Sequence, residues 1–148
     1  MRPLPAFLIA TAALLFAGCA GSTVTNAVHI ANRDAEASGS PFRWEAKNVK
    51  GGAILTSVMI DLPSGPSKAD DILRRDILLY IAAVESAKKR PAPEVDEVRH
   101  MSDGREVWVL KHPTDGIAYV ITMKPSPKGG TDLAINGPHV FEKKADLQ

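Results

Sequence analysis

Four strand-like segments, separated by turn residues, follow one long helical segment, and this succession constrains the fold more than any other feature of the chain. The four strand-like segments are residues 95–101, 105–112, 117–124 and 131–136. Asp103-Gly104 separates the first two segments and predicts a two-residue hairpin loop, because both loop positions need positive φ. We therefore expect an antiparallel meander.

Two more strands precede the helical segment. Residues 42–47 alternate strictly, and residues 54–62 alternate with many β-branched side chains. Gly51-Gly52 lies between them and indicates a turn. These two strands are predicted to stand before the helix in the chain order.

The helical segment runs from Ser67 to about Lys89. Ser67 and Asp70 have capping-box spacing, with Asp in place of the usual Glu, and Pro91 prevents continuation of the helix. Its middle, residues 77–84, is apolar on all sides, which is typical of a helix buried on more than one side. We expect such burial, and a helix that binds a partner is the alternative.

Together these segments predict the α+β fold class. The expected architecture is a two-layer sandwich, one long helix packed on an antiparallel sheet, with the order β-β-α-β-β-β-β. Residues 42–142, roughly 100 residues, are enough for a single globular domain with one core. Residues 143–148 are predicted to form a polar tail.

The expected register divides the side chains of the meander between two faces. A two-residue turn at Asp103-Gly104 places Arg99 opposite Trp108 and His100 opposite Val107. The face expected to contact the helix consists of Val95, Met101, Trp108, Leu110, Tyr119, Ile121 and Met123. The opposite face consists of Val98, His100, Val107, Val109, Ala118, Val120 and Thr122.

This second face is more apolar than a solvated sheet surface requires, so we expect something to cover it. The N-terminal strands or the segment before them are one candidate, and another protein is the other. The candidate interaction surface consists of Val98, His100, Val107, Val109 and Val120 on this face, and of Lys128 in the loop 125–130.

The N-terminus has the features of an export signal. Arg2 precedes an apolar run of 14 residues, 4–17, which suits the core of a signal peptide and is too short to cross a bilayer as a helix. Phe16-Ala17-Gly18 ends this run directly before Cys19, the single cysteine of the chain. The stretch resembles the lipobox of bacterial lipoprotein precursors, with Phe16 where Leu is usual.

The resemblance covers residues 1–19 and implies how the chain is processed. Cleavage between Gly18 and Cys19 would remove residues 1–18, and Cys19 would carry a thioether-linked diacylglycerol and an acylated amino terminus, for example with palmitate. This lipid makes a membrane the expected partner. Ala20, where Asp would favour the inner membrane, implies the periplasmic side of the outer membrane. The alternative is the outer face of the plasma membrane.

Composition suggests a spacer after the anchor. Residues 19–41 are rich in Ala, Ser, Thr, Gly and Asn, and we predict a flexible lipid-anchored tether that spans roughly 25 Å. Loss of Arg2 with the leader leaves 17 Lys and Arg residues against 17 Asp and Glu residues. A neutral chain lacks the basic footprint of nucleic-acid-binding proteins, so no nucleic acid partner is expected.

No catalytic motif stands out. The four His residues, at 29, 100, 112 and 139, lack metal-ligand spacing, so no metal or cofactor is expected. We therefore expect a non-enzymatic binding or accessory module of the cell envelope, with an envelope protein or polymer as partner. The alternative is a small periplasmic hydrolase or ligand-processing enzyme. A buried His100 beside a carboxylate in a deep cleft would favour that alternative.

Overall fold

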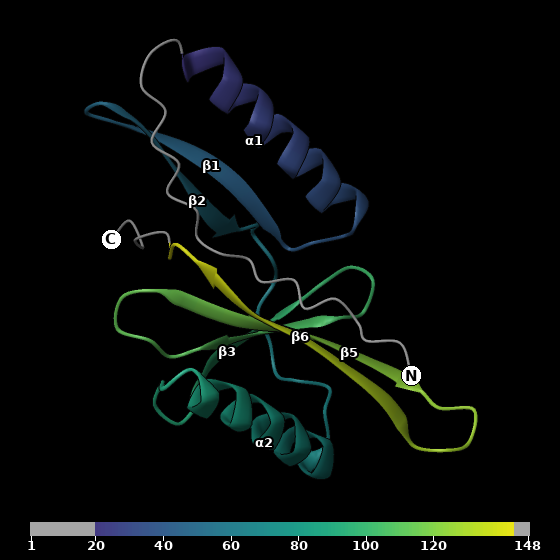
Figure 1. Cartoon of the computed structure of the whole chain (residues 1–148). Helices are drawn as coiled ribbons and strands as arrows, with labels where there is room; N and C mark the ends of the chain where they lie inside the picture. Colours follow the sequence, from purple (N-terminus) through teal and green to yellow (C-terminus); the bar gives the residue numbers. More distant parts are fainter. Residues whose placement is uncertain (1–19, 144–148) are drawn as a thin grey trace, which may run out of the picture.

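The computed structural model describes residues 20–143 (Figure 1). Its elements, in chain order, are α1 (Ala20–Ala37), β1 (Phe42–Val49), β2 (Gly52–Met59), α2 (Asp71–Ala87), β3 (Val95–His100), β4 (Glu106–Leu110), β5 (Gly116–Pro125) and β6 (Thr131–Phe141). The strands form two antiparallel sheets, a β1-β2 hairpin and a four-stranded sheet in the order β3-β4-β5-β6. The predicted α+β class and the antiparallel meander are confirmed.

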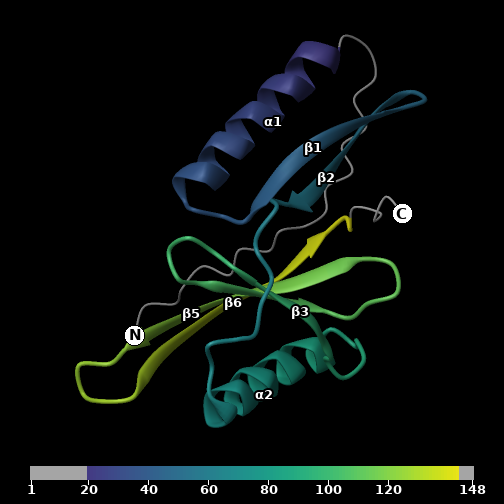
Figure 2. The same ribbon diagram turned by 180° about the vertical axis from the view of Figure 1, so that it is seen from behind.

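Helix α2 covers one face of the four-stranded sheet, as Figures 1 and 2 show from opposite sides. The buried residues of this core are Ile77, Ile81, Val98, Trp108, Leu110, Ile117, Tyr119 and Ile121. Full burial of each large aliphatic or aromatic side chain contributes about 1.5–3 kcal/mol. The prediction of which sheet residues contact the helix is therefore largely correct.

The chain covers the second face of this sheet itself. Phe42 of β1, Leu62 after β2 and Phe141 of β6 pack against that face in a second buried cluster. The sheet residues of the cluster are Val107, Val109, Ala118 and Val120. Of the covers considered from the sequence, the N-terminal strands are observed, through Phe42. Leu62, in the segment after β2, and Phe141 of β6 add to the cover and were not foreseen.

The loop between β3 and β4 differs from the prediction by one residue. Met101 N–H donates to Arg105 O over 2.9 Å and Gly104 N–H donates to Met101 O over 3.1 Å, so three residues, 102–104, form the loop. Gly104 has a φ of 90°, the left-handed conformation that ends a three-residue loop of this kind. The assumption of a two-residue loop was therefore wrong.

That single residue shifts β3 relative to β4. Val98 pairs with Trp108, Arg99 pairs with Val107 and His100 pairs with Glu106. Since a slip of one residue exchanges the faces of a strand, Val98 joins the α2 core and Met101 packs in the other cluster. The expected positions of Val98, His100 and Met101 were wrong for this reason.

Helix α2 begins one turn later than the capping-box spacing suggests. The side chain of Asp70, the N-cap residue, accepts a hydrogen bond from Leu73 N–H at 2.8 Å. Ile77 and Ile81 are fully buried, whereas the side chains of Leu79 and Tyr80 are exposed. The prediction of burial on more than one side was wrong, because Leu79 and Tyr80 lie within the apolar stretch and are exposed.

Helix α1 replaces the predicted flexible tether over most of its length. Val24, Val28, Ala31 and Ala35 are partly buried at spacings of three and four residues, which is the pattern of an amphipathic helix. The tether prediction was wrong here, because small residues such as Ala also favour helices when one side can pack. Within residues 20–143, no helix is both long and apolar enough to cross a membrane.

Candidate functional site

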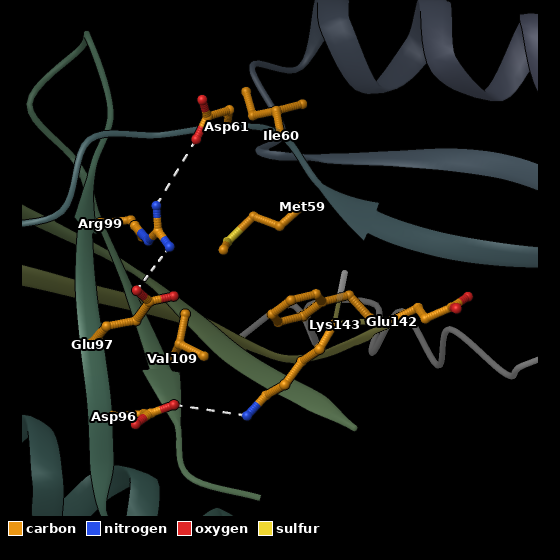
Figure 3. Close-up of a pocket in the computed structure, with 10 residues that line it drawn as sticks. Met59, Ile60, Asp61, Asp96, Glu97, Arg99, Val109, Glu142 and Lys143 are labelled. Atoms are coloured by element: carbon orange, nitrogen blue, oxygen red, sulfur yellow. Dashed lines mark ion pairs between the residues drawn. The ribbon is translucent and has the colours of Figure 1, made fainter. Parts of the chain in front are cut away.

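A cleft of about 590 Å³ lies between the end of the β1-β2 hairpin and the four-stranded sheet (Figure 3). The side chains that line it come from four separate stretches of sequence. These residues are Met59 at the end of β2 with Ile60 and Asp61 after it, Asp96, Glu97 and Arg99 of β3, Val109 of β4, and Phe141, Glu142 and Lys143 at the end of β6. The apolar members form a floor, and the charged members stand around it.

Backbone contacts on two sides hold the cleft open. At one side, Glu142 N–H donates to Ser57 O over 2.7 Å, which joins the end of β6 to β2. At the other side, Gly65 N–H donates to Val98 O over 3.1 Å and His100 N–H donates to Pro63 O over 2.8 Å. The chain between these two contacts passes over the sheet without adding a strand to it, and the cleft lies beneath.

Arg99 is the central cation of the cleft. Its Nη1 donates to Leu62 O at 2.7 Å, and its Nη2 lies 2.8 Å from Glu97 Oε2. Asp61 Oδ1 lies 4.0 Å from Nη1, and this carboxylate is fully exposed to solvent. The guanidinium therefore ties the linker to β3, while Asp61 is a loose partner that a ligand can displace.

Lys143 forms the opposite wall. Its Nζ lies 3.7 Å from Asp96 Oδ2, and it donates to His112 O at 3.4 Å. Glu142 faces away from this pair and binds Lys47 of β1. The hydrogen bond from Lys47 lowers the pKa of Glu142 below its usual value. A lowered pKa is the wrong direction for a carboxyl group that acts as a general acid near neutral pH.

The lining suits recognition better than catalysis. Among the described residues that line it, there is no Ser, Thr, Cys or His side chain that could act as a nucleophile or a neutral base. Because Glu142 faces away, three carboxylates and two cations stand around the apolar side chains. Such a lining suits a ligand that joins an apolar part to a cationic or zwitterionic part. In residues 20–143, no three His, Cys, Asp or Glu side chains are arranged to hold a metal ion.

His100 does lie near a buried carboxylate, but outside the cleft. Its Nδ1 is 3.9 Å from Glu106 Oε1, and neither residue lines the cleft. Ser67 Oγ donates to Glu106 at 2.7 Å and has no hydrogen bond to His100, so this group is not a nucleophile-base pair. His100 and Glu106 therefore do not form the pair in a deep cleft that would have favoured an enzyme.

Glu106 has a structural role. Its carboxylate accepts hydrogen bonds from Ser67, from Lys68 N–H at 2.7 Å and from Trp108 Nε1 at 2.9 Å. Burial acts to raise the pKa of Glu106, but these donors outweigh it and the pKa lies below its usual value. The charged carboxylate thus fastens the segment before α2 to the sheet.

A second buried carboxylate, Glu85, fastens the other end of α2. Arg90 and the hydroxyl of Tyr119 both donate to it. Burial acts to raise the pKa of Glu85, but the hydrogen bonds from Arg90 and Tyr119 outweigh it and lower that pKa. No sequence pattern pointed to Glu85 or Glu106, because Tyr119 is 34 residues from Glu85, and Ser67 and Lys68 are 39 and 38 residues from Glu106.

The four valines of the predicted interaction surface are buried within the chain. Val98, Val107, Val109 and Val120 are at most 7% exposed, so they belong to the two cores. His100 is partly buried, and Lys128 is exposed in the loop between β5 and β6. Gly18 and Cys19 lie outside the described residues.

The arginine beside Trp108 is not the one expected. Arg99, which the expected register placed opposite Trp108, lines the cleft, and the guanidinium of Arg74 lies 5.5 Å from the centre of the Trp108 ring.

Comparisons of the chain with protein-family models, with curated proteins and with solved structures gave no match.

Proposed function

We propose that this chain is a lipid-anchored protein of the cell envelope that acts as a non-enzymatic binding module. The anchor is Cys19, acylated after removal of residues 1–18, on the periplasmic side of the outer membrane. The support for the anchor is the sequence 16–19, Phe-Ala-Gly-Cys, at the end of an apolar leader. The described helices offer no membrane span that would replace it.

The cleft carries the binding part of the proposal. Its volume falls within the range of ligand sites, and its six charged residues among ten make it more polar than the usual small-molecule pocket, which favours a ligand with charged groups. The loosest ion pairs of the cleft, Arg99–Asp61 at 4.0 Å and Lys143–Asp96 at 3.7 Å, can exchange partners at little cost. We infer that a segment of an envelope protein or polymer occupies this cleft.

Site-specific photo-crosslinking in cells tests the binding site. A photoreactive residue at Asp61, on the rim of the cleft, should give discrete adducts, whereas the same residue at Glu45 on the exposed part of β1 should not. Lys128 provides a third position, in the loop between β5 and β6. Adducts from position 128 alone would move the binding site to that loop.

A charge exchange supplies a matched control. Asp96→Lys should reduce the adducts from position 61 several-fold, because it reverses the charge of one wall. The double variant Asp96→Lys with Lys143→Glu keeps an ion pair at this position and so separates a binding defect from a folding defect. Unchanged adducts in both variants would show that the cleft is not the binding site.

A further inference from the structure

The free end of the β1-β2 hairpin exposes apolar side chains next to a lysine. We call residues 49–52 together with Ile54 the hairpin tip. Val49 is 41% exposed and Ile54 is 47% exposed, and Lys50 between them is exposed as well. Val49 pairs with Gly52 and Lys47 pairs with Ile54. Since residues 47 and 49 lie on one side of β1, Val49 and Ile54 share one face of the ribbon.

The hairpin tip lies at the same end of the molecule as the first residue of α1. Asn32 of α1 is hydrogen-bonded to Trp44 of β1, and the two elements run in opposite directions in both views (Figures 1 and 2). From that contact, the 12 residues back to Ala20 span about 18 Å of helix. The six residues forward to Lys50 span about 20 Å of strand.

This arrangement matters because Cys19 directly precedes Ala20 in the sequence. Helix α1 starts at Ala20, so a lipid on Cys19 would be one residue away from a helix that is packed on the hairpin. A flexible tether would let the domain move away from the lipid headgroups, whereas a docked helix holds its own end of the domain beside them.

We propose that the hairpin tip is a second membrane contact, which inserts Val49 and Ile54 at the boundary between headgroups and acyl chains while Lys50 meets the lipid phosphates. The proposal rests on the lipid anchor proposed above. Apolar side chains beside a basic residue are the composition of interfacial membrane contacts, and anionic lipids attract a lysine at this depth. The occupant of the hairpin tip is thus the lipid surface.

The contact would also orient the cleft. β2 leads from the hairpin tip at Gly52 to Met59 on the floor of the cleft, a span of about 23 Å along the strand. With the tip at the headgroups, the cleft is held at the opposite end of the hairpin, away from the bilayer. Both membrane contacts then present the cleft to the periplasm in a fixed orientation.

The test uses the mature protein, as it is isolated from cells, in vesicles of phosphatidylethanolamine and phosphatidylglycerol. An environment-sensitive fluorophore is attached to Val49→Cys, and in a separate variant to Lys128→Cys in the β5-β6 loop. The fluorophore at position 49 should shift to the blue, and its quenching by aqueous iodide should fall several-fold when vesicles are present. The fluorophore at position 128 should show neither change.

Each remaining outcome decides one of the two proposals. If the protein floats with vesicles but position 49 is quenched as readily as position 128, the anchor stands and the hairpin-tip contact is wrong. If the protein does not float, the anchor is wrong and the hairpin-tip contact falls with it. Protection of position 49 in cells but not on protein-free vesicles would assign the tip to a protein partner and overturn the lipid proposal. Lys50→Glu should restore quenching at position 49 while flotation is retained.

Discussion

The side-chain amide of Asn32 bonds both backbone groups of Trp44: Nδ2 donates to Trp44 O at 2.9 Å, and Oδ1 accepts from Trp44 N–H at 2.7 Å. These are the bonds that a neighbouring strand would make, so α1 closes the free edge of β1 at this point. One side chain thereby fixes the helix that follows Cys19 to the hairpin. In the proposed membrane contact, this link sets the orientation of the domain relative to the bilayer.

Asn32→Ala should destabilise the protein by about 1–3 kcal/mol, because both backbone groups of Trp44 lose their partner in a half-buried position. Urea unfolding measures this change, and amide hydrogen exchange at Trp44 should accelerate. Asn26→Ala, on the exposed side of α1, is the matched control and should leave the stability unchanged. Equal stability of the two variants would show that α1 is not fixed through Asn32.

Glu106→Gln should lower the stability at pH 7 by about 1–3 kcal/mol, because an amide cannot accept from all three donors of Glu106. Since folding lowers the pKa of Glu106 from 4.5, its contribution is present above pH 4.5 and is lost as the pH falls through the folded-state pKa. Urea unfolding between pH 3 and pH 7 should therefore show a shallower acid limb for this variant. A variant with the wild-type acid limb would contradict the assigned role.

His139 should add a separate pH dependence at milder acidity. Burial lowers the pKa of His139 from 6.5, and the ring stacks on Phe42 with centroids 4.7 Å apart. The unfolded chain binds a proton below pH 6.5 before the folded chain does, so stability falls from that pH toward the folded-state pKa. His139→Phe should remove this loss in urea titrations, whereas His29→Gln on the exposed side of α1 should retain it.

Val109→Glu should abolish folding rather than weaken a partner contact. Val109 is 2% exposed and packs in the cluster between the hairpin and the sheet, where an unpaired carboxylate costs about 4 kcal/mol or more. Circular dichroism and urea unfolding report the loss. Lys128→Glu in the exposed loop is the control and should fold normally. A folded Val109→Glu protein would contradict the burial of this face and would make it a candidate interaction surface again.

Local patterns in the sequence were sufficient for the strands of the meander and for the approximate extent of α2. They failed at Asp103-Gly104, since the same dipeptide fits loops of two and of three residues, and the choice between them decides the face of Val98. They also failed at α1, although Val24, Val28, Ala31 and Ala35 have helical spacing. The prediction of a tether relied on composition, whereas the spacing of the apolar residues indicates the helix that is observed.

The cleft had no signature in the sequence. Asp61, Arg99 and Lys143 come together only because the linker crosses the sheet and the end of β6 joins β2. Long-range contacts of this kind depend on the tertiary fold, and single-sequence patterns do not contain them.

Fatty-acid labelling of Cys19→Ala in cells tests the central claim most directly, because both the envelope location and the orientation of the cleft depend on the anchor. The wild-type protein should incorporate labelled palmitate and remain with the membrane fraction after a high-salt wash. Cys19→Ala should lose the label and leave that fraction. Labelling that persists in Cys19→Ala, or a wild-type protein without label, would contradict the account.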